Sequence, residues 1–352
     1  MDQLLAQAIA LYQEGALLAS ARYLETCIEA CWGGGQESNK MLALSNLSEV
    51  YMRLGRLKDA EYASIELLAC ARREGSDENH IRAVGRLAMA ALLLDQRSWW
   101  NDLREQLEEA VEMARRIRLR YWVVQNLETL GCFAISVGDT PAGFNWLQMA
   151  LNAIDKNLNE AEFFRARIYC GISDCMMKIG KPQRAVEYAD LAVLTASKAR
   201  SPHLLAISKL SVARVHRFVG DTSEALQYAT EVRVRARRDG WKLEELAAEK
   251  LLHETYYSVA RFGEALEAIL RALSLAEELG LHEDLAHLLL KAAQICRDLG
   301  RPMQAERYLQ RAADLASISD QSEVMAQAQL ALATAGLEIP SRNSLPSSQK
   351  DN

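Results

Sequence analysis

Histidine and carboxylate side chains are the first candidates for chemistry in this chain. The six histidines are scattered, and His253 is followed by Glu254 but by no second histidine four residues on. A zinc hydrolase helix needs two histidines on one face, so this pair lacks a ligand. The sequence also contains no Gly-x-Ser-x-Gly elbow and no glycine-rich phosphate loop. We therefore expect no catalytic residue, no metal site and no cofactor, and an enzyme is the least favoured class.

The seven cysteines point to a reducing environment. Their number is odd, no Cys-x-x-Cys pair occurs, and Cys27 and Cys31 have no histidine nearby that would complete a zinc site. The first residues carry no basic segment of the kind that begins a signal peptide, and the longest apolar run, residues 87–94, is too short to span a bilayer. We expect reduced thiols in a cytoplasmic protein that contacts no membrane.

Two runs of arginine suggest nucleic acid at first sight. At 100° per residue the side chains of each run scatter around a helix, which is typical of a solvated convex face, and the alternative is a basic docking patch. The whole chain has 41 basic and 47 acidic residues and a net charge of -6, which disfavours bulk attraction to nucleic acid. The two runs are Arg115, Arg116, Arg118, Arg120 and Arg233, Arg235, Arg237, Arg238.

The elements that position these residues recur with a fixed period. Gly55 precedes Ala60 by five residues, and the same step separates Gly180 from Ala185. Apolar residues between these points recur every three or four residues, which predicts helices. The chain therefore reads as repeats of helix, tight turn, helix and loop. The tight turns are expected near residues 15, 55, 98, 138, 180, 220, 260 and 300, the third being placed from Leu107 and Ala110 downstream of it.

These offsets resemble the tetratricopeptide-repeat family in a long form of about 40 residues, as in kinesin light chains, G-protein-signalling adaptors and the sensor arrays of bacterial regulators. Repeat two carries Leu47, Ser48, Tyr51, Gly55 and Ala60 at the positions of the family pattern, although the first-helix tryptophan is missing. The resemblance implies an all-α, right-handed solenoid of about eight helical hairpins plus a C-terminal capping helix. We expect the array to occupy residues 1–337 and a disordered polar tail to occupy residues 338–352.

The family also implies that the first helix of each repeat lines a concave groove. From repeat five onward the implied groove positions carry six bases and few acids, which suits a carboxylate or an acidic peptide; the alternative is a polar surface with ion pairs inside the array. The partner-binding candidates are Arg167, Asp174, Lys178, Arg214, Arg217, Lys250, Glu254, Tyr257 and Arg297.

Repeat three differs from the others. Its implied groove positions form an apolar patch, and its turn is three residues longer than usual and contains Trp99 and Trp100. These tryptophans either pack onto the neighbouring repeat or form an exposed anchor for a partner. The patch positions are Gly85, Ala88, Leu92, Asp95 and Gln96.

These patterns favour a non-enzymatic adaptor that binds a peptide segment or a partner helix in its groove. The alternative is a regulatory sensor that binds a short peptide or a small ligand and controls an associated effector. A fragment of a larger regulator is a third possibility. We predict a protein or peptide partner and no nucleic acid, while the oligomeric state is open.

Overall fold

The structure is a computed structural model, and it describes residues 2–31, 36–155, 158, 160–318 and 321–334. These residues form α-helices and one short 3-10 helix, η1, with no strand among them, which confirms the all-α prediction. The helices are α1 (Asp2–Gln13), α2 (Leu17–Ala30), α3 (Glu37–Arg53), α4 (Leu57–Glu74), α5 (Asp77–Leu93), η1 (Arg97–Trp99), α6 (Trp100–Arg116), α7 (Arg120–Ser136), α8 (Thr140–Ala153), α9 (Ala161–Lys178), α10 (Pro182–Lys198), α11 (Pro202–Val219), α12 (Thr222–Asp239), α13 (Lys242–Ser258), α14 (Phe262–Leu279), α15 (His282–Asp298), α16 (Pro302–Ile318) and α17 (Ser322–Thr334).

The tight turns inside the hairpins share one backbone conformation. Gly55 has a φ of 73°, Gly180 of 75° and Gly220 of 86°, which lie in the left-handed region where glycine has no steric penalty. Ala260 takes the same conformation with a φ of 58° at the position where the other repeats carry glycine. The expected turns at these four positions are therefore where the sequence placed them.

The third turn lies earlier than expected. Its left-handed residue is Asp95, with a φ of 56°, and not a residue near 98. The three additional residues follow this turn as η1, and α6 begins only at Trp100. The prediction was displaced because it was counted back from Leu107 and Ala110, which lie beyond the insertion.

Side-chain caps begin several helices as the sequence indicates. The Ser201 hydroxyl accepts a hydrogen bond from the backbone N–H of Leu204 at 3.3 Å, and Pro202 opens α11. Asp139 likewise accepts from the N–H of Ala142 at 3.1 Å. These caps satisfy N–H groups that a helix cannot pair by itself.

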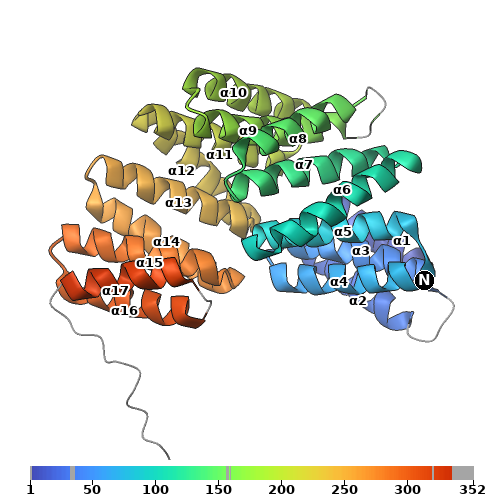
Figure 1. Ribbon diagram of the computed structural model, residues 1–352, viewed down its shortest axis with the longest axis horizontal. Helices are drawn as coiled ribbons and strands as arrows, with labels where there is room; N and C mark the ends of the chain where they lie inside the picture. The colour runs from blue at the N-terminus through green and yellow to red at the C-terminus, as the bar shows by residue number, and fades with distance from the viewer. Residues whose placement is uncertain (1, 32–35, 156–157, 159, 319–320, 335–352) are drawn as a thin grey trace, which may run out of the picture. The chain divides into compact units, whose positions relative to one another are not determined.

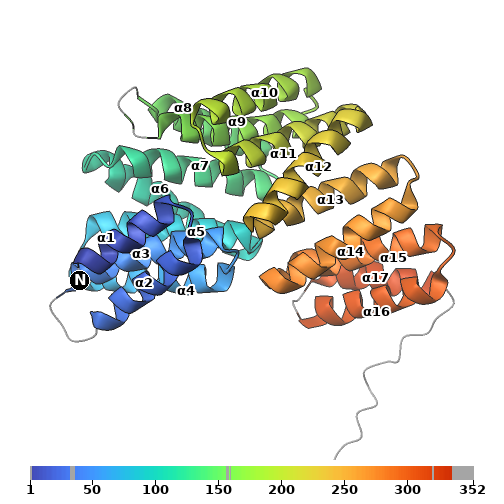
Figure 2. The same cartoon turned by 180° about the vertical axis from the view of Figure 1, so that it is seen from behind.

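The chain divides into two compact units, Met1–Thr255 and Tyr256–Asn352. In the first unit successive helices pack as antiparallel pairs, from α1 with α2 to α11 with α12 (Figures 1 and 2). In the second unit α15 packs on α14 and α16, and α17 covers α16 as the capping helix. The expected tail, residues 338–352, lies outside the described residues.

Small residues set the distance between the helices of each pair. Ala185 and Ala225 are fully buried at the predicted offsets after their turns. One close approach is between α7 and α8, where a Cβ on Gly131 would lie 2.6 Å from Cγ of Leu147. Because α7 is buried along nearly its whole length, its polar side chains are held in the interior of the first unit.

Candidate ligand-binding cavity

Charged residues one repeat apart face each other along the first helices. Nη2 of Arg214 on α11 lies 3.2 Å from Oδ2 of Asp174 on α9, forty residues earlier. Arg217 makes the same kind of contact with Glu254 on α13, at 3.1 Å. Stacking of successive repeats brings such positions together, since each first helix lies beside the first helix of the next repeat.

The remaining bases of the predicted groove also have partners. Nε of Arg167 lies 2.8 Å from Oε1 of Glu128, and Lys178 donates to the carbonyl of Ile135 at 2.6 Å. Arg297 donates to the carbonyl of Ala331. The structure therefore contains the ion pairs within the array that the sequence left as an alternative.

Three of the predicted groove residues share one cavity. Arg167, Asp174 and Arg214 line a cavity in the first unit. Tyr257 and Arg297 belong to the second unit, where the Tyr257 hydroxyl donates to Asp298 at 2.7 Å. The others lie in the first unit but outside the cavity lining: Lys178, Arg217, Lys250 and Glu254.

The cavity has a volume of about 720 Å³ and is lined mainly by the first helices of the repeats. Its wall combines apolar and charged side chains, with Ile9, Leu24 and Phe163 among the apolar ones. This volume and mixture are typical of sites that bury a small ligand or a few residues of a peptide. Its charged groups are the carboxylates of Glu49, Glu128, Glu160, Asp174 and Glu244 and the guanidiniums of Arg53, Arg86, Arg167 and Arg214, joined by His203.

One end of the cavity wall is organised around Glu49. Its carboxylate accepts a hydrogen bond from the Tyr12 hydroxyl at 3.3 Å and pairs with Arg86. Burial alone would raise the pKa of Glu49, but Arg86, Arg53 and Arg167 outweigh it and hold the pKa below its usual range. Glu49 is therefore a fixed negative charge at neutral pH.

The centre of the wall is organised around Glu128, which is only 2% exposed. Burial raises its pKa although Arg167 acts in the opposite direction, and its Oε2 atom has no hydrogen-bond partner among the residues that the structure describes. Burial also raises the pKa of the neighbouring Cys132, so this thiol stays protonated and is a poor nucleophile. This region is therefore suited to binding polar groups.

Met89 and Leu93 were missed from the sequence because the third turn was misplaced by three residues, whereas Arg86 lies at a position that the family pattern does not assign to the groove. Gly85 and Ala88 are buried between helices and do not form the predicted apolar patch, while Gln96 donates to Glu61 on α4. The cavity is instead lined in this repeat by Arg86, Met89 and Leu93. The sequence spacing could have indicated Arg86, because Tyr12 and Glu49 are 37 residues apart and are hydrogen-bonded, and Glu49 and Arg86 are also 37 residues apart and form an ion pair.

The two tryptophans behave differently. Trp100 is half-buried and stacks on Phe133 of α7 with ring centroids 4.9 Å apart, so it packs onto the neighbouring repeat. Trp99 in η1 is 36% exposed. Of this pair, only Trp99 stays a candidate for the predicted anchor.

Two classes of feature are absent from the described part of the chain. No group of three or more His, Cys, Asp or Glu side chains there is placed to hold a metal ion. No helix there combines the length and the apolar character that spanning a bilayer requires.

Comparison with known proteins gives similarity in structure alone. No protein-family model matches the sequence, and no curated protein matches it. Among solved structures, NprR in complex with its cognate peptide NprX is 14% identical with a TM-score of 0.66, covering 89% of this chain and 86% of that one. A Rap protein complexed with Competence and Sporulation Factor is 13% identical with a TM-score of 0.58, and the match covers 95% of this chain and 97% of the Rap protein.

A third similar structure is the STAND protein PH0952 from Pyrococcus horikoshii, which has a tetratricopeptide repeat sensor. It is 14% identical with a TM-score of 0.54, and the match covers 91% of this chain and 53% of that protein. At such low identities these similarities concern the fold. The chain has the fold of the tetratricopeptide-type helical repeat proteins.

Proposed function

We propose that this chain is a non-enzymatic binding protein whose first unit holds a peptide segment of a partner in the cavity. The observation that carries the proposal is the cavity of about 720 Å³, whose wall combines apolar and charged side chains and lies mainly on the first helices. Two proteins of the same fold, NprR and Rap, have been crystallised with a peptide and with Competence and Sporulation Factor, respectively. Both support a peptide as the class of ligand.

The charges of the wall favour a ligand that both donates and accepts hydrogen bonds. Arg167 and Arg214 each pair with an acid, and carboxylates and guanidiniums are nearly equal in number around the cavity. A short peptide offers amide donors, carbonyl acceptors and charged ends in one extended molecule. The acidic partner segment expected from the sequence stays a prediction.

A regulatory sensor is the second candidate. It is favoured by the similarity to NprR, described as a quorum sensor, and to the repeat sensor of PH0952. An adaptor would hold its partner without a change of shape, whereas a sensor would change curvature on binding. Small-angle scattering with and without a bound peptide separates the two, because only the sensor changes its radius of gyration.

The test of binding uses a pool of synthetic hexapeptides passed over the immobilised full-length chain, with retained peptides identified by mass spectrometry. We expect enrichment of a subset of peptides by the unaltered chain. Arg214→Glu should weaken their binding by about tenfold or more, because the reversed charge lies beside Asp174 in the cavity wall.

The matched control is Arg115→Glu, whose side chain lies on α6 outside this cavity. It should leave the enriched peptides unchanged. Equal retention of every peptide by both variants and by the unaltered chain would contradict the proposal.

A further inference from the structure

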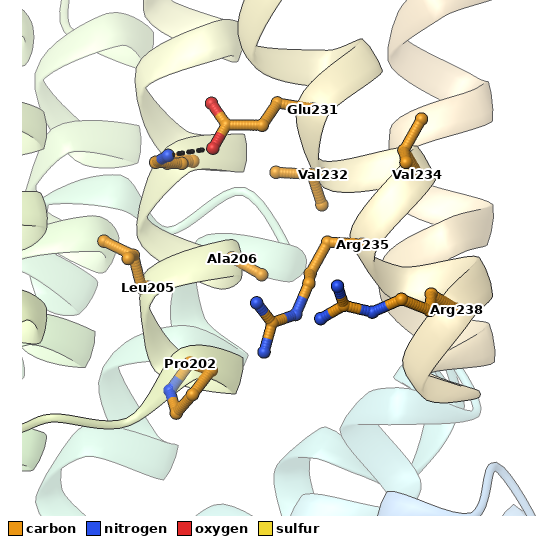
Figure 3. A pocket seen from close by; sticks show the side chains of 9 residues that line it. Pro202, Leu205, Ala206, Glu231, Val232, Val234, Arg235 and Arg238 are labelled. Carbon is orange, nitrogen blue, oxygen red and sulfur yellow. Dashed lines mark hydrogen bonds and ion pairs between the residues drawn. The ribbon is translucent and has the colours of Figure 1, made fainter.

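A second pocket lies between α11 and α12 of the first unit and shares no residue with the cavity (Figure 3). Its volume is about 240 Å³. The apolar part of its lining consists of Pro202, Leu205 and Ala206 on α11 and Val232 and Val234 on α12. Val234 is 60% exposed, so it presents an apolar side chain to solvent at the edge of the pocket.

Cationic side chains border this apolar lining. The guanidiniums of Arg235 and Arg238 extend from α12 into the opening between the two helices (Figure 3). Both use Nε to bind one carboxylate, that of Asp239, with Arg238 at 2.8 Å. Two guanidiniums thus share a single acid, and the guanidinium of Arg235 also lies over the Trp241 ring, 5.6 Å from its centroid.

The charge around the pocket is therefore positive. Lys209 on the α11 side is already paired with Glu231, so the excess lies on the α12 side. Guanidinium groups bind carboxylates through two parallel hydrogen bonds, and such a border selects an acidic partner.

We propose that this pocket docks an acidic segment of a partner protein. An apolar side chain of the segment covers Leu205 and Val234, and a neighbouring Asp or Glu carboxylate binds the guanidiniums of Arg235 and Arg238. A nucleic acid fits less well, because a phosphate backbone presents no group to the apolar lining, and because the whole chain has a net charge of -6. Of the second arginine run, Arg235 and Arg238 would then form the basic docking patch that the sequence left as an alternative.

The experiment measures fluorescence anisotropy of labelled 15-residue peptides with the full-length chain. The probe repeats the triplet Glu-Glu-Leu; one comparison peptide carries Ser in place of every Leu, and another carries Gln in place of every Glu. A 15-nucleotide single-stranded DNA is the fourth probe. We expect the Glu-Glu-Leu peptide to bind at least about tenfold more tightly than the other three.

Two variants assign the binding to the pocket. Arg238→Glu reverses a charge at its border, and Val234→Ser removes an exposed apolar side chain, so neither disturbs the buried core. Each should weaken binding of the Glu-Glu-Leu peptide by about tenfold or more, with an unchanged circular dichroism spectrum.

The matched control is Arg115→Glu in the other arginine run, where Arg115 also pairs with an acid, Glu112, at 2.5 Å on α6. It should change the affinity less than about twofold. Arg214→Glu should also leave this probe bound, so failure here is distinguishable from failure of peptide binding in the cavity.

Four results would overturn the proposal. The first is equal binding of the Ser-substituted peptide, which would indicate charge attraction alone. The second is an equal loss with Arg115→Glu. The third is tighter binding of the DNA that is lost with Arg238→Glu, which would assign the patch to nucleic acid. The fourth is no binding of the Glu-Glu-Leu peptide at concentrations up to about 1 mM.

Discussion

Arg214 and Asp174 occupy neighbouring first helices and form an ion pair of 3.2 Å across one repeat. Arg167 and Glu128 do the same one repeat earlier in the chain, at 2.8 Å. These pairs connect successive repeats through the wall of the cavity, so the same side chains contribute to stacking and to the ligand surface. A ligand that binds them acts on groups that already hold two repeats together.

The Arg214–Asp174 pair should contribute little stability by itself. Both side chains are about one third exposed, so a double-mutant cycle with Arg214→Gln and Asp174→Asn should give a coupling energy of about 1 kcal/mol or less. Urea unfolding of the four proteins measures it. The exchanged pair, Arg214→Asp with Asp174→Arg, should restore stability but not peptide binding, since the charges then face the ligand in reversed order. Recovery of both properties would show that the pair is only structural.

The contact of α7 with α8 should not tolerate a methyl group. Gly131→Ala should lower the free energy of unfolding by about 1–3 kcal/mol, because the new Cβ would lie 2.6 Å from Leu147. Gly263→Ala is the control, since nothing lies within 4 Å of a Cβ at that position in α14. This second change should raise stability by about 0.5–1 kcal/mol through the better helix propensity of alanine. Thermal and urea unfolding measure both, and the same sign for both would refute this account of the packing.

Damage from overpacking inside a hairpin should stay local. Ala225 is fully buried where α12 meets α11, so Ala225→Leu should cost about 1–3 kcal/mol. Hydrogen exchange read by mass spectrometry should show lost protection in α11 and α12 and retained protection in α3 and α4, because repeats stabilise mainly their neighbours. Ala265→Leu makes the same test in the second unit, where Ala265 is also fully buried. Uniform loss across all helices would argue against nearest-neighbour stacking.

Stability of the first unit should depend on the protonation of Glu128. Burial raises its pKa in the folded chain above that of the unfolded chain, so the folded state holds this proton more tightly. The contribution of Glu128 to stability is therefore fully present below the unfolded pKa and is lost as the pH rises through the folded pKa. Glu128→Gln carries no titrating carboxyl group, so its free energy of unfolding should fall less as the pH rises. Urea unfolding at a series of pH values from 4 upward measures the difference.

A second variant checks the cause of this pH dependence. Arg167 lowers the pKa of Glu128, so Arg167→Gln should extend the decrease in stability to higher pH. If Arg167→Gln leaves the profile as in the unaltered chain, the carboxylate is not coupled to that guanidinium.

The sequence by itself determined the repeat and its turns. A left-handed residue at Gly55, Gly180 and Gly220, and the cap formed by Ser201, depend on local conformational preferences that act within a few residues. Buried alanines such as Ala185 follow from the same spacing, since close helix pairs need small residues at fixed offsets. The turns, the helix cap and the buried alanines could therefore be predicted without knowledge of the contacts between repeats.

Only the tertiary structure decided which side chains face each other. The turn at Asp95 gives Met89 and Leu93 the groove positions that a turn near 98 assigned to Leu92 and Gln96, and both line the cavity together with Arg86. Neighbouring arginines lower the pKa of Glu49 and burial raises the pKa of Glu128, although both are glutamates on first helices. The physical reason is that pairing and desolvation depend on the distances between repeats, and those distances arise only when the helices pack.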